Sequence, residues 1–325
     1  MTYTSTDPSG KSGCHFVVNW DHEHLLAGRI SRSKQRKTCR LGRNSRLWLL
    51  LLFSLLSFPV GAQEIGTLTL MEGSLEVIRG TAVLRGVEGM RVRQGDILQS
   101  SDPGFAQIEF KSGTITALGA SSRLFLDGDA GTRGSELVLL SGWLKGQTGA
   151  GAVTYHYASP LLAAMTRDGT VVLHAAAEAA EVFVETGSAG ISEVSLEGNL
   201  GHPGKAKEGQ FFTRRSGKKV VVQSRPDSTF LESMPRSFRD TFPSRLARFA
   251  GKAPAPKRDH EVTYSEIEPW LNTLPIWRVG FVRRFEPRLE DAAFRKAVED
   301  HLEDHPEWDR ALHPEKYEPK TPVSQ

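Results

Sequence analysis

Cysteine is missing from most of this chain. Its two cysteines are Cys14 and Cys39, so residues 63–325 contain none. That stretch can form no disulfide, cannot hold a metal through thiolates and has no cysteine nucleophile. A body of this length must be held together by its own hydrophobic core, and it is long enough for one large domain or two modest ones.

The chain also lacks a hydrophobic run long enough to cross a membrane. Its longest apolar run, 47–58, has 12 residues. As a helix this run would reach about 18 Å, short of the ~30 Å hydrocarbon core. Eight basic residues between 29 and 46 precede it with no acidic residue among them, and Pro59 follows it. These features are typical of a secretory signal peptide.

Small residues follow the apolar run as Val60-Gly61-Ala62, which predicts cleavage between Ala62 and Gln63. The working protein is then 63–325, in the periplasm or secreted, which excludes most chemistry that depends on cytosolic ATP or NADH. The alternative is an uncleaved leader that anchors the chain in the inner membrane, facing the periplasm. We expect contact with the membrane only in that case, through the leader.

An excess of positive charge is absent once the leader is set aside. The whole chain has 41 Lys and Arg and 38 Asp and Glu, and nine of the basic but only three of the acidic residues precede residue 63. The remainder therefore carries 32 basic and 35 acidic residues, a formal charge of −3. Nucleic-acid binding needs a positive field, so this balance predicts no nucleic-acid partner.

Long helical periodicity is absent between residues 65 and 223. Short runs rich in Val, Leu, Ile, Thr and Phe alternate there with turns of Gly, Asp and Ser. The pattern predicts a mainly β fold with many short strands, in a sandwich- or solenoid-like domain. The expected strands are 67–71, 74–79, 82–85, 97–100, 106–110, 114–118, 123–126, 136–140, 143–146, 153–157, 163–166, 171–175, 181–185, 193–196, 210–213 and 219–223.

The residue pattern changes after the strand-like region, which ends at 223. Residues 250–259 (AGKAPAPKRD) have the composition of a linker. Helical patterns follow at 265–271, 277–285 and about 289–304. We therefore divide the chain into a leader with signal peptide (1–62), a β-domain (63–224), a linker (225–260) and a small helical C-terminal region (261–325). The aromatic residues of that region are expected to pack in a core: Trp270, Trp277, Phe281, Phe285, Phe294 and Trp308.

The motifs of enzymes and of cofactor or metal sites are not found. No G-x-S-x-G element occurs, and His301 and His305 lack the glutamate that the zinc-protease helix has after its first histidine. The turn that begins at Asp127 lacks the later ligands of a calcium loop. The sequence thus predicts no catalytic residue, no cofactor and no metal. Paired carboxylates of a carbohydrate-active enzyme stay open as an alternative, because their separation is spatial.

Three segments resemble, in order, the FecR domain, a periplasmic module of iron-dicitrate signalling regulators. LMEGSLEVIR at 70–79 is similar to the family's opening strand pair, with its turn at Glu72 and Gly73. VRQGDILQS at 92–100 is similar to its "GD" turn, here Gly95 and Asp96. AQIEFKSGT at 106–114 resembles its next hairpin, with Gly113 in the turn and Ser112 where aspartate is usual. LVLLSGW at 137–143 and the stretch 157–170 continue the resemblance.

The resemblance implies an all-β envelope module that contacts other proteins or polymers and is not catalytic. Founding members of the family pass a signal from an outer-membrane transporter to a sigma factor, but residues 1–46 show no helical bundle that could hold one. We therefore expect a non-enzymatic exported protein that binds an envelope protein or polysaccharide, in signalling or envelope assembly. A membrane-anchored sigma-factor regulator and an envelope carbohydrate-active enzyme are the alternatives, and no oligomeric state is predicted.

Overall fold

A computed structural model describes residues 63–127, 135–149 and 153–317. The prediction of a mainly β fold with a small helical C-terminal region is confirmed. The strands are β1 (Glu64–Glu72), β2 (Leu75–Arg79), β3 (Ala82–Arg85), β4 (Arg91–Arg93), β5 (Ile97–Ser100), β6 (Phe105–Phe110), β7 (Ile115–Leu118), β8 (Arg123–Leu126), β9 (Ser135–Thr148), β10 (Tyr155–Ala158), β11 (Leu162–Thr166), β12 (Gly169–Ala176), β13 (Ala179–Glu193), β14 (Gly204–Lys207), β15 (Phe211–Arg215), β16 (Val221–Gln223) and β17 (Lys257–Glu261).

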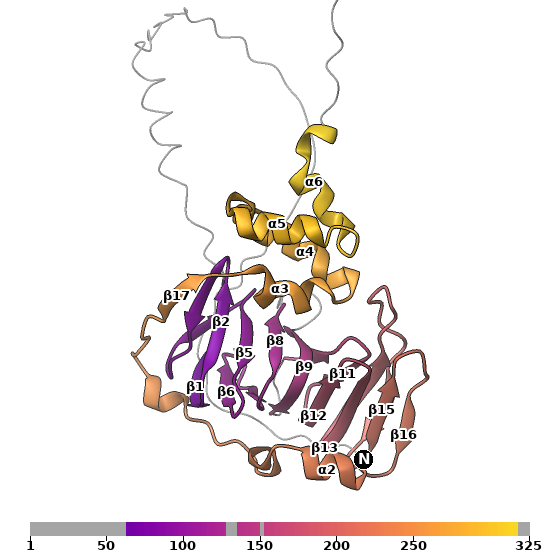
Figure 1. Ribbon diagram of the computed structural model, residues 1–325. Coiled ribbons are helices and arrows are strands. Elements are labelled where there is room, and N and C mark those ends of the chain that lie inside the picture. Colours follow the sequence, from indigo (N-terminus) through magenta and orange to yellow (C-terminus); the bar gives the residue numbers. More distant parts are fainter. Residues whose placement is uncertain (1–62, 128–134, 150–152, 318–325) are drawn as a thin grey trace, which may run out of the picture. The chain divides into compact units, whose positions relative to one another are not determined.

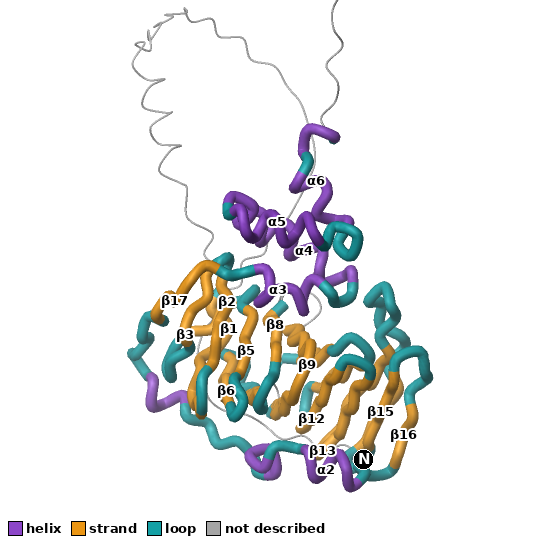
Figure 2. The backbone as a smooth tube through the Cα atoms, viewed as in Figure 1, coloured by secondary structure: helices purple, strands orange, loops and turns teal. Residues whose placement is uncertain are grey.

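The strands form two sheets, which we call A and B. Sheet A has the order β4-β1-β6-β7-β9-β12-β13-β15-β16. Sheet B has the order β17-β3-β2-β5-β8-β9-β10-β11-β13-β14. All neighbours are antiparallel except β9 and β10, which are parallel. Figures 1 and 2 show the strands with helices on two sides of them.

Two long strands, β9 and β13, belong to both sheets. The first half of β9 pairs with β8 in sheet B, and its second half pairs with β7 and β12 in sheet A. β13 crosses in the opposite direction, from β12 and β15 to β11 and β14. Gly142 and Gly187 lie at the two crossing points with φ of +90° and +72°. A residue with a Cβ adopts these angles only under strain, so glycine lets each strand bend between the sheets.

The core between the two sheets is built from alternating strand residues such as Leu68, Val77, Leu98, Leu124 and Val171, all 0% exposed. The outer faces of the sheets are apolar as well. β6 and β7 are buried along their whole length, which a strand with one solvent face would not be. Each outer face must therefore be covered by another part of the chain.

Sheet B is covered by the C-terminal helices, which lie over it in Figure 1. The helical elements are α3 (Tyr264–Leu271), α4 (Pro275–Phe285), η4 (Glu286–Glu290), α5 (Ala292–Asp300), η5 (Pro306–Trp308), α6 (Asp309–Leu312) and η6 (Pro314–Lys316). Their aromatic side chains bury against strand residues such as Ile97 and Val138. The predicted aromatic core is therefore present and joins the helices to the β-domain.

Sheet A is covered by residues 228–245, which we call the strap. The strap contains α2 (Ser228–Ser233) and η2 (Arg236–Arg239), followed by a third short helix, η3 (Leu246–Phe249). It buries Phe230, Phe238 and Phe242 against Trp143 and Phe211 of the sheet. Much of the expected linker, 225–260, is thus packed on sheet A. Its last residues belong to β17, which extends sheet B.

Polar side chains on the outer face of sheet A fix the position of the strap. Lys145 is 1% exposed, and its Nζ donates to the carbonyls of Phe238 at 2.6 Å and Asp240 at 3.0 Å while pairing with Glu185 at 2.7 Å. Gln147 exchanges two hydrogen bonds with the backbone of Phe242. These bonds satisfy strap groups that would otherwise be buried without partners.

Glu109 makes a second attachment to the strap. Burial alone would raise the pKa of Glu109, but hydrogen bonds from Ser244, the Arg245 amide and Gln107 outweigh it and hold the pKa below its ordinary value. Glu109 is therefore ionised at neutral pH, and its charge strengthens the bonds it accepts from the end of the strap.

We predict that Lys145→Met destabilises the protein and loosens the strap. The change leaves two strap carbonyls and Glu185 without their donor, so the free energy of unfolding should fall by about 3 kcal/mol. Urea denaturation measures this, and trypsin should cut the strap at Arg236 and Arg239 faster than in the parent. Lys111→Met, at an exposed hairpin position, is the matched control. Equal midpoints for the two variants would contradict this account of Lys145.

Candidate functional site

The five turn residues named for the FecR resemblance lie in three separate turns. Gly73 follows β1 with φ of +73°, and Glu72 and Gly73 line a surface cavity beside Trp143. Gly113 lies in the β6–β7 hairpin with φ of +86° and open space around it. Gly95 and Asp96 form the turn between β4 and β5. The structure does not bring these five residues together into one site.

The Gly95-Asp96 turn organises a junction between the sandwich and the helices. Asp96 is 1% exposed and takes a bidentate pair from Arg79, Nε at 2.9 Å and Nη2 at 2.7 Å, together with the Arg93 amide. From α4, Arg284 donates to the carbonyls of Gly95, Gly80 and Ile78 at 2.6–3.0 Å. Burial lowers the pKa of Arg284 to about 10, so it stays cationic at neutral pH. These residues hold α4 in place.

The predicted cleavage point cannot be placed in the fold, because Ala62 lies outside the described residues. Gln63 is the first described residue, and its carbonyl accepts a hydrogen bond from the Gln94 amide at 3.0 Å. Among the described residues, no group of three or more His, Cys, Asp and Glu could hold a metal ion. No helix in the described part is long and apolar enough to cross a membrane.

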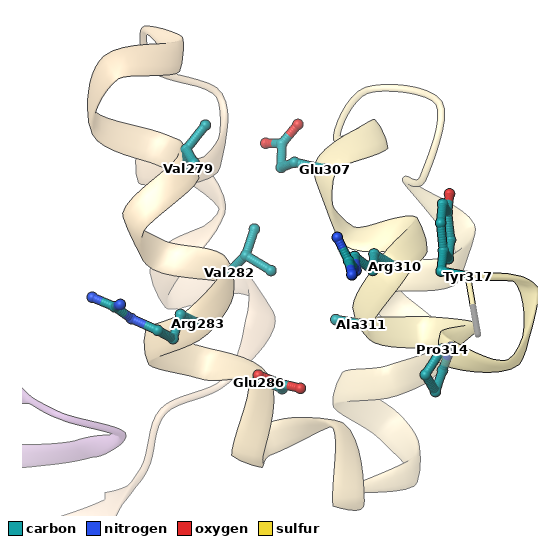
Figure 3. Close-up of a pocket in the computed structure, with 9 residues that line it drawn as sticks. All are labelled: Val279, Val282, Arg283, Glu286, Glu307, Arg310, Ala311, Pro314 and Tyr317. Carbon is teal, nitrogen blue, oxygen red and sulfur yellow. The ribbon is translucent and has the colours of Figure 1, made fainter. Parts of the chain in front are cut away.

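An open groove of about 650 Å³ lies between α4 and the C-terminal turns. Val279 and Val282 lie on its α4 side, and Ala311 and Pro314 lie on the other side. Charged residues and a tyrosine line it as well: Arg283, Glu286, Glu307, Arg310 and Tyr317. Figure 3 shows Val282 facing Ala311 and Arg310 across the gap, whereas Arg283 points away from α6. The ion pair between Arg278 and Glu307, with Nε and Oε1 3.1 Å apart, connects the two sides.

The exposed side of α4 next to this groove is also apolar. Ile276 is 54% exposed and Val279 is 58% exposed, one helical turn apart on the same face. Gly280 beside them has no atom near the position of a Cβ, so the helix backbone itself is open to approach. We call the groove together with Ile276 and Val279 the α4 surface. The sequence signal that could have indicated the α4 surface is the presence of apolar residues on both faces of α4. A helix that only covers a core has polar residues on its outer face.

A network of charged and polar side chains connects β17 to the start of α3. His260 Nε2 lies 2.7 Å from Glu266 Oε1, and Glu266 Oε2 accepts from the Thr263 amide at 2.7 Å in a capping box. The hydrogen bond with Glu266 is the main reason that the pKa of His260 lies above its ordinary value of 6.5, and Asp259 adds to it. Asp259 in turn pairs with Arg85.

We predict that the His260 ring titrates above pH 6.5 and that Glu266→Gln lowers its midpoint, as followed by NMR. Because the folded-state pKa is raised, the stability from this contact is fully present below about pH 6.5 and is lost as pH rises through the raised value. His260→Gln should remove this pH dependence from the free energy of unfolding. His202→Gln, at an exposed position, should keep it. A midpoint at or below 6.5 would refute the assignment.

Comparison with known proteins gives only weak similarity. No family model and no curated protein sequence matches the chain. Two crystal structures of a proposed anti-sigma factor from Parabacteroides distasonis, at 1.65 and 2.50 Å resolution, are similar with TM-scores of 0.36 and 0.35 and identities of 8% and 9%. Each alignment covers 42% of this chain, and 62% and 64% of theirs, so the chain spans less than two thirds of their length.

Proposed function

We propose that this chain is a non-enzymatic, FecR-like protein of the cell envelope that binds a partner protein through the α4 surface. The observation that supports the proposal is the pair of half-exposed aliphatic side chains, Ile276 and Val279, beside an open groove lined by four aliphatic and four charged side chains together with Tyr317. Apolar side chains gathered at one place on a surface mark interaction sites more often than single exposed ones do.

The way α4 is held supports a binding role. Its inner side chains, Trp277, Phe281 and Phe285, are at most 5% exposed, and Arg284 fixes it to one strand carbonyl and two turn carbonyls. The outer face is therefore presented in a fixed position, and a partner need not order it on binding. Rigid, pre-formed surfaces give up little entropy when a complex forms.

The chemistry of the surface favours a protein over a polysaccharide. Four aliphatic side chains line the groove, and they are Val279, Val282, Ala311 and Pro314. The other lining residues are Tyr317 and the charged Arg283, Glu286, Glu307 and Arg310, which leave the aliphatic part as the surface that only an apolar partner group can cover. Burying the aliphatic side chains stabilises a complex only if the partner brings apolar groups to them. A glycan, whose surface carries many hydroxyl groups, would leave polar groups unpaired against the aliphatic part.

The proposal is tested by point variants of the exported protein. Ile276→Asp combined with Val279→Glu should lower capture of the envelope partner at least tenfold, because removal of central apolar contacts costs about 2 kcal/mol or more. Capture from envelope extract, with the partner identified by mass spectrometry and its affinity measured after purification, gives the result. Leu231→Glu on α2, 40% exposed in the parent, is the control. Equal capture by both variants would exclude the α4 surface.

The envelope location is a separate part of the proposal, supported by the leader. If the leader is cleaved as the sequence predicts, mass spectrometry of the protein from a periplasmic fraction should find an N-terminus at Gln63. An intact leader in the membrane fraction would instead favour the anchored signalling regulator. Recovery of the protein from the cytosol would contradict both.

A further inference from the structure

Four strands form the edges of the two sheets in the described part of the chain: β4 and β16 in sheet A, β14 and β17 in sheet B. An edge strand presents unpaired N–H and C=O groups that can accept another strand. Natural proteins guard such edges with charged side chains. The four edges differ in how many charged side chains they carry.

Three of the edges carry charges. β4 has arginines at both ends, Arg91 and Arg93. β14 exposes Lys205 and Lys207, and β17 reads KRDHE, with charged or titratable residues at every position. Pairing a further strand with any of these would require desolvating those groups, which is costly. Their composition acts against strand addition.

The fourth edge, β16, is apolar. Val221 and Val222 are 54% and 52% exposed, although successive residues of a strand point to opposite faces. Both valines therefore lie beyond the cores on either side of sheet A. β16 carries no charged residue, and β15 is its only neighbour among the described strands.

Basic residues surround this apolar edge. Arg215, Lys218, Lys219 and Arg225 are all exposed, and none belongs to an ion pair among the described residues. The nearby carboxylate of Glu193 is already engaged, since it lies 3.7 Å from Arg214 and accepts from the Val220 amide at 2.8 Å. The four basic side chains around β16 are therefore not paired with a carboxylate of the described residues.

We propose that the outer edge of β16 accepts an extended segment of another protein, apolar at its centre and acidic at its ends, as an added strand of sheet A. The two valines would contact its central side chains, and the lysines and arginines would pair with its flanking carboxylates. A second copy of this chain fits less well, because antiparallel pairing of two β16 strands brings the same basic residues against each other.

The test uses synthetic strand peptides with the whole exported chain. The acidic probe is EDVTVTVDE and the basic probe is KKVTVTVKK, both capped at their ends and followed by fluorescence anisotropy at low salt. The acidic peptide should bind at least tenfold more tightly than the basic one, and its affinity should fall as salt rises. Amide hydrogen exchange should show β16 protected by the acidic peptide, since strand addition pairs its free backbone groups.

Two surface variants separate the apolar from the electrostatic contribution. Val221→Ser with Val222→Ser should weaken the acidic peptide at least fivefold without changing charge. Lys219→Glu with Arg225→Glu should remove most of the preference between the two peptides, because the four surrounding residues then carry no net formal charge. The α4 variant, Ile276→Asp with Val279→Glu, is the matched control and should bind the acidic peptide like the parent. This control keeps the outcome independent of the function proposed above.

Several results would overturn the inference. Equal affinity for the two peptides would remove the role of the basic residues. Binding without protection of β16 amides would show an ordinary charged patch in place of an added strand. A dimer in sedimentation experiments that dissociates in the double serine variant would assign this edge to a second copy of the chain.

Discussion

The apolar character of both outer faces of the sandwich is the constraint on which the rest of the structure depends. A two-sheet sandwich commonly buries its inner faces and leaves polar side chains outside. Here Ile97 and Val138 lie on the outside of sheet B, and Phe105, Trp143 and Phe211 on the outside of sheet A, all at most 9% exposed. The chain after β16 must therefore cover two faces, and the strap and the C-terminal helices do so.

Covering an apolar face with irregular backbone creates a second requirement. The strap has few backbone hydrogen bonds of its own, so its carbonyls and amides need partners from the sheet. Lys145, Gln147 and Glu109 supply them from the outer face of sheet A. On the other side of the sandwich the donor comes from the covering helix, where Arg284 donates to the carbonyls of Ile78 in a strand and Gly95 in a turn. Long polar side chains thus fix the position of the strap on sheet A and of the C-terminal helices on sheet B.

The sequence was sufficient for the fold class and for most strands. Alternation predicted 82–85, 97–100 and 123–126 with the bounds that β3, β5 and β8 have. The expected strands also left gaps at 141–142 and 186–192, which contain Gly142 and Gly187. The structure instead continues β9 and β13 through these glycines into the other sheet. Local patterns cannot distinguish a turn from such a crossing, since the difference lies in which strands pair on either side.

The candidate sites were less predictable for a related reason. The sequence pattern identifies Asp96 as a turn residue, but in the structure it pairs with Arg79. The neighbouring Gly95 accepts a hydrogen bond from Arg284, 189 residues later in the sequence. The all-β module that the FecR resemblance implies agrees with the observed fold class, and the family itself stays a prediction because no family model matches. The α4 surface and the β16 edge carry no motif. Ile276 and Val222 differ from core residues only in what the rest of the chain leaves uncovered.

The sandwich, the strap and the C-terminal helices depend on one another, and this decides which experiments can assign binding to one region. Removing everything after residue 224 would expose Trp143 and Phe211 on one side and Ile97 and Val138 on the other. Such a fragment would present new apolar surface of the kind that binds partners unspecifically. A comparison of the whole chain with that fragment would measure this exposure together with any specific site. Surface substitutions on α4 and β16 leave both coverings intact, so a change in binding can be attributed to the substituted face.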